Sequence, residues 1–418
     1  MLAFGTLTPD SDPAITSSPL EYYQYDPKAL LSDGEAPPCH PWLQDVQAKV
    51  IRGQVVQKGL MQLQEKGLAP DLVIGHTGWG ELMGLRAILP KTPILGYPEY
   101  FFHWQGADCN FDPEFQYLHP DSASEQALRR ALQLLDLSEI DWGLAPTWWQ
   151  WSLMPQAYRQ RFSVIHEGID CERIAPKPNA SVQLEKSGLH FQAGDELVTY
   201  ISRDLEPHRG FLTFMRSLPL LLRRRPQAHV LIVGGTGPGY STAPPPDFDS
   251  WKDFLLHHMG PLLDASRVHF LPKLPHPVLH EVLRVSAAHV YLTVPFVLSW
   301  SLLEAMACAA PIVASNTEPV RELIRDGIEA RLVNMLDPQE LARVIIEVLE
   351  NPEKHRQMGA NARRHVQQHY DLHRVCLPQQ LELVETLLQG IEPAPPQPPP
   401  GIERALFQPP PPRLKPRP

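Results

Sequence analysis

The sequence predicts an α/β protein with two Rossmann-like domains that face a cleft. Short runs rich in β-branched residues alternate with longer segments of helical periodicity, which is the pattern of parallel strand–helix units. The chain has 418 residues, a length typical of two domains. Hydrophobic residues make up 43% of it and charged residues 20%, so a large soluble core can form.

The expected strands form two groups. Those of the first half are 72–74, 94–95, 143–145 and 164–165, and those of the second half are 198–201, 230–233, 268–271, 290–293, 312–314 and 331–333. The expected helices are 211–224, 277–285, 301–308, 319–325, 338–350 and 352–369. Between the two groups, 170–195 is rich in Pro, Ser and Lys and has little periodicity, so we interpret it as the domain junction.

Proline is unusually frequent, with 46 residues, many of them in 391–418. That stretch cannot pack, so it predicts a disordered or polyproline-II tail, either an inert spacer or a partner-binding segment. The predicted divisions are therefore an N-terminal domain over 1–185, a C-terminal domain over 190–371, a closing helix over 372–390 and the tail.

Charge and cysteine content exclude several classes of protein. A formal charge of -10 argues against a general nucleic-acid binder. Arg223, Arg224 and Arg225 form a local basic patch, which is either a solvated helix end or a contact for an anionic lipid or polymer. The cysteines lack zinc or disulfide spacing, so no metal site is expected from Cys39, Cys109, Cys171, Cys308 and Cys376.

The sequence also shows no signal for membrane insertion or export. There is no run of eighteen apolar residues, and the first residues lack the basic and apolar regions of a signal peptide. A cytoplasmic protein is therefore expected.

Two arginines follow the first expected strand of the second half. Arg203 and Arg209 lie in a loop that ends at a glycine leading into a helix. Loops at the carboxyl ends of parallel strands are where such sheets bind ligands. Two guanidinium groups there suit a diphosphate, because each donates bidentate hydrogen bonds. Ordinary surface arginines would leave the same pattern.

A glycine-rich string follows the next strand and includes Gly234, Gly235 and Gly239. It resembles a dinucleotide fingerprint, but such a loop must open directly onto a helix. Here it runs into 240–246, which ends in three prolines and cannot be a helix. A NAD site is therefore disfavoured, while close backbone approach to a ligand and a plain turn both stay open.

The most specific motif spans 295–315, where a strand leads through a loop to a helix beginning near Ser301. A helix N-terminus carries about half a positive charge and free N–H groups, so it binds anions. Glu304 lies in the first turn. It is either a ligand-binding carboxylate or the partner of Ser301 in a capping box.

These residues resemble the donor-site signature of glycosyltransferase family 4. The similarity rests on SLLEAMACAAPIVAS at 301–315, followed by Glu318 to Leu323. Weaker similarities lie at 268–272, at 361–364 (the closing helix) and at 166–170 (the turn before the linker). The match covers roughly 71–389 and is stronger in the second half.

The resemblance implies the GT-B fold and a retaining transferase that needs no metal and no cofactor beside its nucleotide diphosphate sugar. It assigns the leaving diphosphate to Arg203 and Arg209, and the donor's ribose hydroxyls to Glu304. In the family's usual account the diphosphate itself helps take the acceptor's proton. The remaining expected donor-binding residues are Gly234, Gly235, Lys273, Ser299, Trp300 and Ser301.

Two departures from the family pattern matter. The family usually has a glutamate eight residues before Glu304, touching the transferred sugar, and this chain has Phe296. The string PFVLSWSLLEAM resembles a bacterial subgroup that lacks that glutamate. In addition, the chain opens at 2–6 with what resembles the second strand of the family's first domain. Either the start is assigned too late or the domain is truncated, and we favour a misplaced start.

The acceptor half offers candidates in two loops. Residues 75–80 follow one strand and 97–104 follow another, where loops facing a cleft are expected. Their aromatic rings suit stacking on a sugar or packing in a core. The titratable candidates are His76, Glu99 and His103.

The leading prediction is a bacterial enzyme of polysaccharide biosynthesis. It would move a hexose from a nucleotide diphosphate sugar to a saccharide or lipid acceptor, with peripheral contact at the inner face of the membrane left open. The alternatives are a non-catalytic GT-B protein that keeps the nucleotide site for binding or assembly, and a dehydrogenase resting on the glycine-rich string alone.

Overall fold

The computed structural model describes residues 2–5, 21–24, 40–104, 106–115, 120–184, 188–237 and 239–400. The chain divides into two compact units. The first comprises Met1–Trp104, Leu118–Ile165 and Glu382–Pro400, and the second includes Gln105–Tyr117 and His166–Leu381. This division differs from the predicted boundaries, because the junction expected at 185–190 lies inside the second unit.

The first unit is built on a four-stranded parallel sheet with the order β3-β4-β5-β6. Its strands are Val73–His76, Ile94–Tyr97, Trp142–Ala145 and Phe162–Val164, as expected from the sequence within a few residues. Its helices are α2 (Gln44–Glu65), α3 (Leu85–Ile88), α4 (Pro120–Glu139) and α5 (Trp148–Leu153). A separate pair of parallel strands is formed by β1 (Leu2–Gly5) and β2 (Glu21–Gln24).

The last helix in the described residues, α13 (Leu377–Leu388), completes the core of the first unit. Leu95, Trp142 and Leu144 of the sheet pack with Leu383 and Leu387 of this helix. The predicted closing helix at 372–390 is thus a π-helical turn at Leu372–Cys376 followed by α13.

The second unit contains a six-stranded parallel sheet with the order β11-β10-β9-β12-β13-β14. The strands are β9 (Leu197–Asp204), β10 (His229–Gly235), β11 (Val268–Leu271), β12 (Ala288–Tyr291), β13 (Ile312–Ser315) and β14 (Arg331–Val333). After β9, the chain adds β10 and β11 on one side of that strand. It then adds β12, β13 and β14 on the other side. The order of a doubly wound sheet therefore reverses between β9 and β12, and such switch points bind ligands at the carboxyl ends of the strands.

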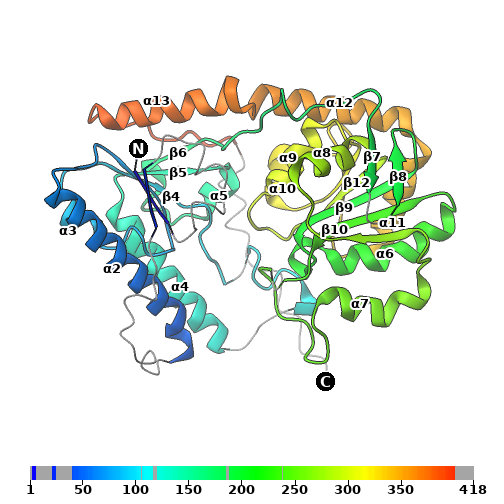
Figure 1. Ribbon diagram of the computed structural model, residues 1–418, viewed down its shortest axis with the longest axis horizontal. Coiled ribbons are helices and arrows are strands. Elements are labelled where there is room, and N and C mark those ends of the chain that lie inside the picture. Colours follow the sequence, from blue (N-terminus) through cyan, green and yellow to red (C-terminus); the bar gives the residue numbers. More distant parts are fainter. Residues whose placement is uncertain are drawn as a thin grey trace. The chain divides into compact units, whose positions relative to one another are not determined.

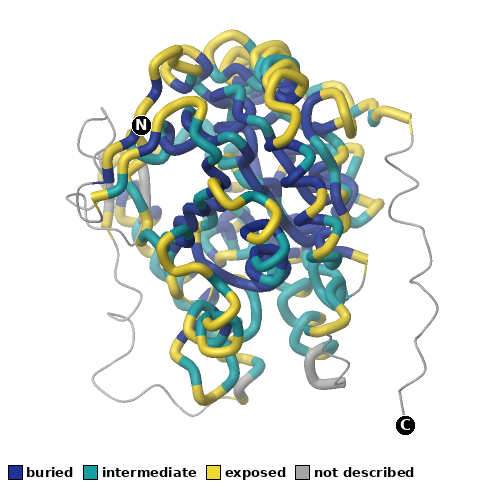
Figure 2. The backbone as a smooth tube through the Cα atoms, turned by 90° about the vertical axis from the view of Figure 1, so that its right-hand side faces the viewer, coloured by how far each residue is buried: buried dark blue, intermediate teal, exposed yellow. Residues whose placement is uncertain are grey.

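Helices cover both faces of this sheet, which explains why its strands are apolar on both sides (Figure 1). Leu197 and Ile201 of β9 belong to the core beneath α8, α9 and α12, while Tyr200 stacks on Phe214 of α6 at 4.7 Å. Buried residues are drawn dark blue and exposed ones yellow in Figure 2. The helices are α6 (Phe211–Arg224), α7 (Trp251–Met259), α8 (His276–Val285), α9 (Trp300–Ala307), α10 (Glu318–Leu323), α11 (Pro338–Glu350) and α12 (Pro352–His369).

The segment interpreted as an aperiodic junction contains a hairpin. Strands β7 (Ser181–Leu184) and β8 (Leu189–Gln192) pair antiparallel, and Val182, Leu184 and Phe191 join the core of the second unit. Alternation of buried and exposed residues along β7 accounts for the strand. These two strands were not among the expected elements.

The remaining predictions concern the tail, the cysteines and membrane spans. Residues 391–400 form neither helix nor strand, and the rest of the predicted tail, like Cys39, lies outside the described residues. Of the cysteines that are described, Cys171, Cys308 and Cys376 are free. In the described part of the chain, none of the helices combines the length and apolar character needed to span a bilayer.

Candidate functional site

Arg209 links the two loops at the switch point of the second unit. Its Nη1 donates hydrogen bonds to Oγ1 of Thr293 at 2.8 Å and to the carbonyl of Val297 at 3.3 Å, both in the loop after β12. The hydroxyl of Tyr200, on β9, donates to the carbonyl of Arg209 at 2.7 Å. The guanidinium is thus held where the ends of β9 and β12 meet.

Gly210 explains why the loop can turn directly after Arg209 into α6. Its φ of 68° is in the left-handed region, which a residue with a side chain adopts at a cost. A Cβ there would also lie 2.5 Å from Cβ of Leu292, at the end of β12. Glycine therefore lets the two loops approach each other.

Arg203 stands on the same loop but has different partners. Its side chain is 76% exposed, and its Nη1 lies 3.4 Å from the hydroxyl of Tyr240. Its Nε lies 3.8 Å from Oδ2 of Asp204. The structure thus brings the two predicted arginines to one loop, with Arg209 fixed by the protein and Arg203 extended into solvent.

The glycine-rich string ends β10 beside a buried carboxylate. Oδ1 of Asp204 lies 3.1 Å from Nζ of Lys273 and accepts a hydrogen bond of 3.3 Å from the N–H of Gly237. A Cβ on Gly235 would lie 2.4 Å from that oxygen and 2.5 Å from Cε of Lys273. These glycines therefore make room for an ion pair within the protein, a role that the sequence did not indicate for Asp204.

Glu206 anchors the segment that follows the glycines. It is 2% exposed, and its Oε2 accepts hydrogen bonds from the N–H of Tyr240 at 2.6 Å and from the N–H and hydroxyl of Ser241, both at 2.8 Å. The sequence gave no signal for this contact, since the partners are more than thirty residues apart. Glu206 thereby positions Tyr240 beside the switch point.

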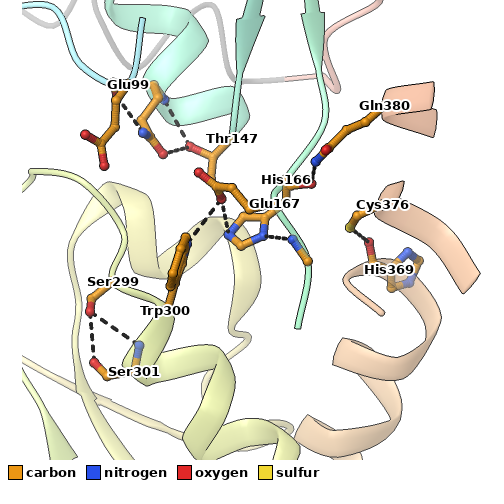
Figure 3. Close-up of polar contacts among 12 residues, drawn as sticks. Glu99, Thr147, His166, Glu167, Ser299, Trp300, Ser301, His369, Cys376 and Gln380 are labelled. Atoms are coloured by element: carbon orange, nitrogen blue, oxygen red, sulfur yellow. Dashed lines mark hydrogen bonds and ion pairs between the residues drawn. The ribbon is translucent and has the colours of Figure 1, made fainter. Parts of the chain in front are cut away.

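The helix N-terminus expected near Ser301 begins one residue earlier. Ser299 is the N-cap of α9, and its Oγ accepts from the N–H of Ser301 at 3.3 Å (Figure 3). Trp300, the first helical residue, is 54% exposed and donates from Nε1 to Oε2 of Glu167 at 3.3 Å. Burial raises the pKa of Glu167, which this indole hydrogen bond counteracts.

Glu304 is not the partner in a capping box, because Ser301 is not the N-cap. Its carboxylate is 7% exposed and points to α8, where its Oε1 lies 3.2 Å from Nε2 of His280 and 3.6 Å from Nδ1 of His276. The capping interpretation was wrong. Histidines four residues apart on one helix were the available signal for this cluster, and the sequence analysis missed it.

Phe296 lies among other aromatic rings. It is buried, with ring centroids 5.1 Å from Tyr240 and 6.2 Å from His208, and the Arg209 guanidinium carbon is 5.7 Å from its ring centroid. The position that usually carries a glutamate in family 4 is therefore an apolar contact in this chain.

The first unit brings together two of its three predicted candidates. Nε2 of His76, at the end of β3, lies 3.4 Å from Oε2 of Glu99, which follows β4, and its Nδ1 lies 2.7 Å from the carbonyl of Thr77. Nε2 of His103 instead lies 2.8 Å from the carbonyl of Leu153, next to the end of α5. Of the three candidates, only His76 and Glu99 contact each other, and both side chains are partly exposed.

A buried acid supports the loop that follows His76. Oδ2 of Asp136, on α4, accepts a hydrogen bond of 2.5 Å from the N–H of Gly78. Burial raises the pKa of Asp136 to about 6, although the Gly78 hydrogen bond opposes that shift, and the nearby Glu81 adds to it.

Two family models match the chain in succession. "Glycosyl transferase family 4 group" matches residues 4–174, and "Glycosyl transferases group 1" matches residues 183–365. Together these models span both units, and by sequence the chain belongs with the family-4-like glycosyltransferases. The resemblance drawn from the donor motif is thereby confirmed.

Curated relatives of this family-4-like glycosyltransferase are partial matches. The D-inositol 3-phosphate glycosyltransferase of Mycolicibacterium gilvum is 30% identical over 191 residues, covering 45% of this chain and 39% of the relative. The enzyme of that name from Streptomyces coelicolor is 28% identical, covering 50% of this chain and 46% of its own. The chain thus spans less than half the length of these relatives.

Solved structures extend the likeness of the family-4-like glycosyltransferase to both units. Anabaena HepE in complex with UDP-glucose has a TM-score of 0.59 at 19% identity, covering 81% of this chain and 83% of that one. Sucrose-phosphate synthase from Thermosynechococcus elongatus has a TM-score of 0.61 at 20% identity, covering 82% and 79%. At identities this low, the structural likeness shows the fold alone. That fold is the predicted GT-B class.

Proposed function

We propose that this chain transfers a hexose from a nucleoside diphosphate sugar to a saccharide or lipid acceptor, with retention of configuration. The observation that carries the proposal is Arg209, which is fixed between the loops after β9 and β12. A guanidinium at the switch point of a doubly wound sheet suits an anionic ligand. The curated relatives are glycosyltransferases, which supports the same reaction class.

The diphosphate would bind to Arg203, Arg209 and the N-terminus of α9. Arg209 is preorganised by its hydrogen bonds, whereas Arg203 is exposed and has only long contacts with Tyr240 and Asp204. The first turn of α9 adds N–H groups and the positive end of the helix dipole. Negative charge that develops on the leaving diphosphate would thus meet positive charge already in place.

The ribose would bind to Glu304. An ionised carboxylate accepts hydrogen bonds from two neighbouring hydroxyls. His280 contacts one of its oxygens, Oε1, which leaves the other, Oε2, and the remaining lone pair for a ligand. The α8 and α9 scaffold around it is apolar and buried, which keeps the carboxylate in place.

UDP is the donor nucleotide that we favour. Anabaena HepE is described in complexes with UDP-glucose and with UDP and glucose, and S. aureus TarM in a complex that contains UDP. Phe296 cannot replace the hydrogen bonds of a glutamate to the transferred sugar. We therefore expect the sugar to be held mainly by other groups.

In the proposed reaction the bond between sugar C1 and the diphosphate oxygen breaks, and C1 forms a bond to the acceptor oxygen on the same face. The acceptor's proton passes to the departing diphosphate. Arg203, Arg209 and the α9 N–H groups would stabilise that diphosphate, so no separate base is assigned. Removing one such donor typically lowers the rate about 10² to 10³-fold.

The test is a transfer assay with UDP-glucose and related donors, offered a panel of acceptors that includes inositol phosphate and oligosaccharides. Proton NMR of the product reports the configuration at C1. An α-linked product that disappears in Arg209→Ala supports the proposal. A β-linked product would contradict retention.

A non-catalytic nucleotide-binding protein is the second candidate, and Phe296 is the observation that favours it. Its ring occupies the position of a sugar-binding glutamate and packs against Tyr240 and His208. Binding of UDP with no release of sugar from any donor, with or without acceptors, would support this candidate against the first.

We further propose a cytoplasmic protein that contacts membranes through the end of α6. Arg223 and Arg224 are exposed there, whereas Arg225 pairs with Glu196. Sedimentation with vesicles of anionic phospholipid tests this contact. Binding that survives in Arg223→Glu/Arg224→Glu would contradict it.

A further inference from the structure

We propose that His276, His280 and Glu304 form a site for a divalent transition-metal ion, and that Zn²⁺ bound there competes with the nucleotide for Glu304. The three ligand atoms all lie within 4.8 Å of one another. Two imidazoles and a carboxylate are a donor set that Zn²⁺ takes in proteins, with three protein ligands and a fourth position left open.

Two packed helices hold these ligands. His276 and His280 are four residues apart on α8, so their side chains lie on one face, one turn apart. Glu304 projects from α9. Leu283 of α8 and Leu302 of α9 belong to one buried core, so the helices that carry the ligands are fixed relative to each other.

The distances from the Glu304 carboxylate to the two imidazoles are close to those of a tetrahedral ion. Ligand atoms bound to Zn²⁺ at about 2.0–2.1 Å in tetrahedral geometry lie roughly 3.3–3.4 Å from one another. Oε1 of Glu304 lies 3.2 Å from Nε2 of His280 and 3.6 Å from Nδ1 of His276. Both separations are within a few tenths of an ångström of the tetrahedral value.

Two of the three ligand side chains are buried and one is exposed, which suits an ion that enters from solvent. The side chains of His280 and Glu304 are 6% and 9% exposed, while that of His276 is 70% exposed. A buried carboxylate is costly unless it is paired or coordinates a cation. An ion held by the two inner ligands would be capped by His276 from the solvent side.

The competition rests on the proposed function, in which Glu304 also binds the ribose. A carboxylate whose oxygen is bound to Zn²⁺ has fewer lone pairs for the ribose hydroxyls. Binding linkage is reciprocal. Bound nucleotide must therefore lower the affinity for Zn²⁺ by the same factor by which bound Zn²⁺ lowers the affinity for the nucleotide.

Calorimetric titration of Zn²⁺ into the full, untagged and chelator-treated chain tests the site without nucleotide. The proposal predicts one Zn²⁺ per chain, weakened at least about 100-fold in His276→Ala and in His276→Gln, because even outer-shell partners cost 10 to 100-fold. His190→Ala, which changes an exposed histidine on β8, is the matched control and should bind as the wild type does.

Unchanged Zn²⁺ affinity in both His276 variants would overturn the site, as would an equal loss in His190→Ala. Unchanged melting temperatures in the absence of metal show that the variants are folded, which the exposure of His276 leads us to expect. Cobalt titration adds a spectroscopic check, because tetrahedral Co²⁺ absorbs strongly in the visible range and octahedral Co²⁺ does not.

A second titration with saturating UDP separates the two proposals. Zn²⁺ affinity at least about tenfold lower with UDP supports the shared carboxylate. If both ligands bind independently, the competition is wrong. If UDP does not bind at all, the proposed UDP donor fails, while the Zn²⁺ site is judged by the nucleotide-free titration.

Discussion

Nη1 of Arg209 donates a 2.8 Å hydrogen bond to Oγ1 of Thr293, and this contact joins the loops that follow the two central strands of the second unit. The contact spans the point where the order of the sheet reverses, between β9 and β12. An arginine fixed there presents its remaining N–H groups to a ligand without having to be ordered first.

Arg209→Lys is expected to lower transfer about 10² to 10³-fold, although it keeps the positive charge. Lysine is a point charge and cannot reproduce the planar fork that bonds Thr293, Val297 and a phosphate together. Steady-state kinetics with a UDP-sugar measures the loss. Arg356→Lys, on the exposed face of α12, should leave the rate unchanged. Equal rates in the wild type and Arg209→Lys would contradict the role of the guanidinium.

Glu304→Gln is expected to abolish discrimination between UDP and 2′,3′-dideoxy-UDP. In the wild type, each hydrogen bond from a ribose hydroxyl to the Glu304 carboxylate should favour UDP by about 1.5–3 kcal/mol. The dideoxy ligand lacks both hydroxyls and therefore cannot form these bonds. Affinities for the two ligands in the two proteins form a double-mutant cycle, which isolates the coupling. A variant that keeps the full preference for UDP would show that Glu304 does not contact the ribose.

Glu206→Ala is expected to lower the free energy of unfolding of the second unit by about 2–4 kcal/mol. The change removes an ionised acceptor and leaves the N–H groups of Tyr240 and Ser241 without it. Denaturant unfolding measures the loss. Glu353→Ala removes an exposed glutamate paired with Arg356 and should change stability by less than about 0.5 kcal/mol. Equal effects of the two changes would contradict the anchoring role.

Asp136 is expected to make the first unit less stable as pH rises from about 4 to 6. Burial raises its folded-state pKa to about 6 from 3.8, so the folded chain holds this proton more tightly than the unfolded chain does. The contribution is therefore complete at low pH, is lost as pH rises through 6, and amounts to about 3 kcal/mol.

Asp136→Asn removes that titration and keeps the acceptor for the Gly78 N–H. The melting temperature of the wild type minus that of the variant should fall between pH 4 and pH 6.5 and stay level above it. Titration of other groups cancels in the difference. A difference that rises with pH in this range would show that the pKa of Asp136 is lowered instead.

Much of the second unit could be predicted from its sequence because its helices and strands carry clear local sequence signals. Helices α6, α11 and α12 begin and end where expected, since proline or glycine marks their starts and apolar residues recur along one face. The central strands β9, β10, β12 and β13 are short apolar runs, largely buried on both faces, which stand out against polar flanks.

The first unit was harder because its apolar pattern is weak. Helix α2 was not expected, since its buried face is made of Gly53, Val56, Leu60 and Leu63 together with the polar Lys49. Too few of these positions are apolar to show a helical period. The hairpin β7–β8 was missed for a related reason, because two short strands with buried Val182 and Phe191 lie within a polar stretch.

The site shows the same division. Arg209 and Glu304 could be proposed from loops at strand ends and from the family motif. Their partners Thr293 and His280 lie far along the chain, and no local pattern connects them. Such pairs depend on which strands become neighbours, and the reversal of the sheet order between β9 and β12 decides that.

Calorimetric titration of UDP into the full chain, compared with Arg209→Ala, is the measurement that tests the central claim most directly. The account predicts that the wild type binds one UDP, that Arg209→Ala binds it at least about tenfold more weakly, and that Arg356→Ala binds as the wild type does. Equal affinity in the wild type and Arg209→Ala, with all three proteins folded, would contradict a diphosphate site between β9 and β12.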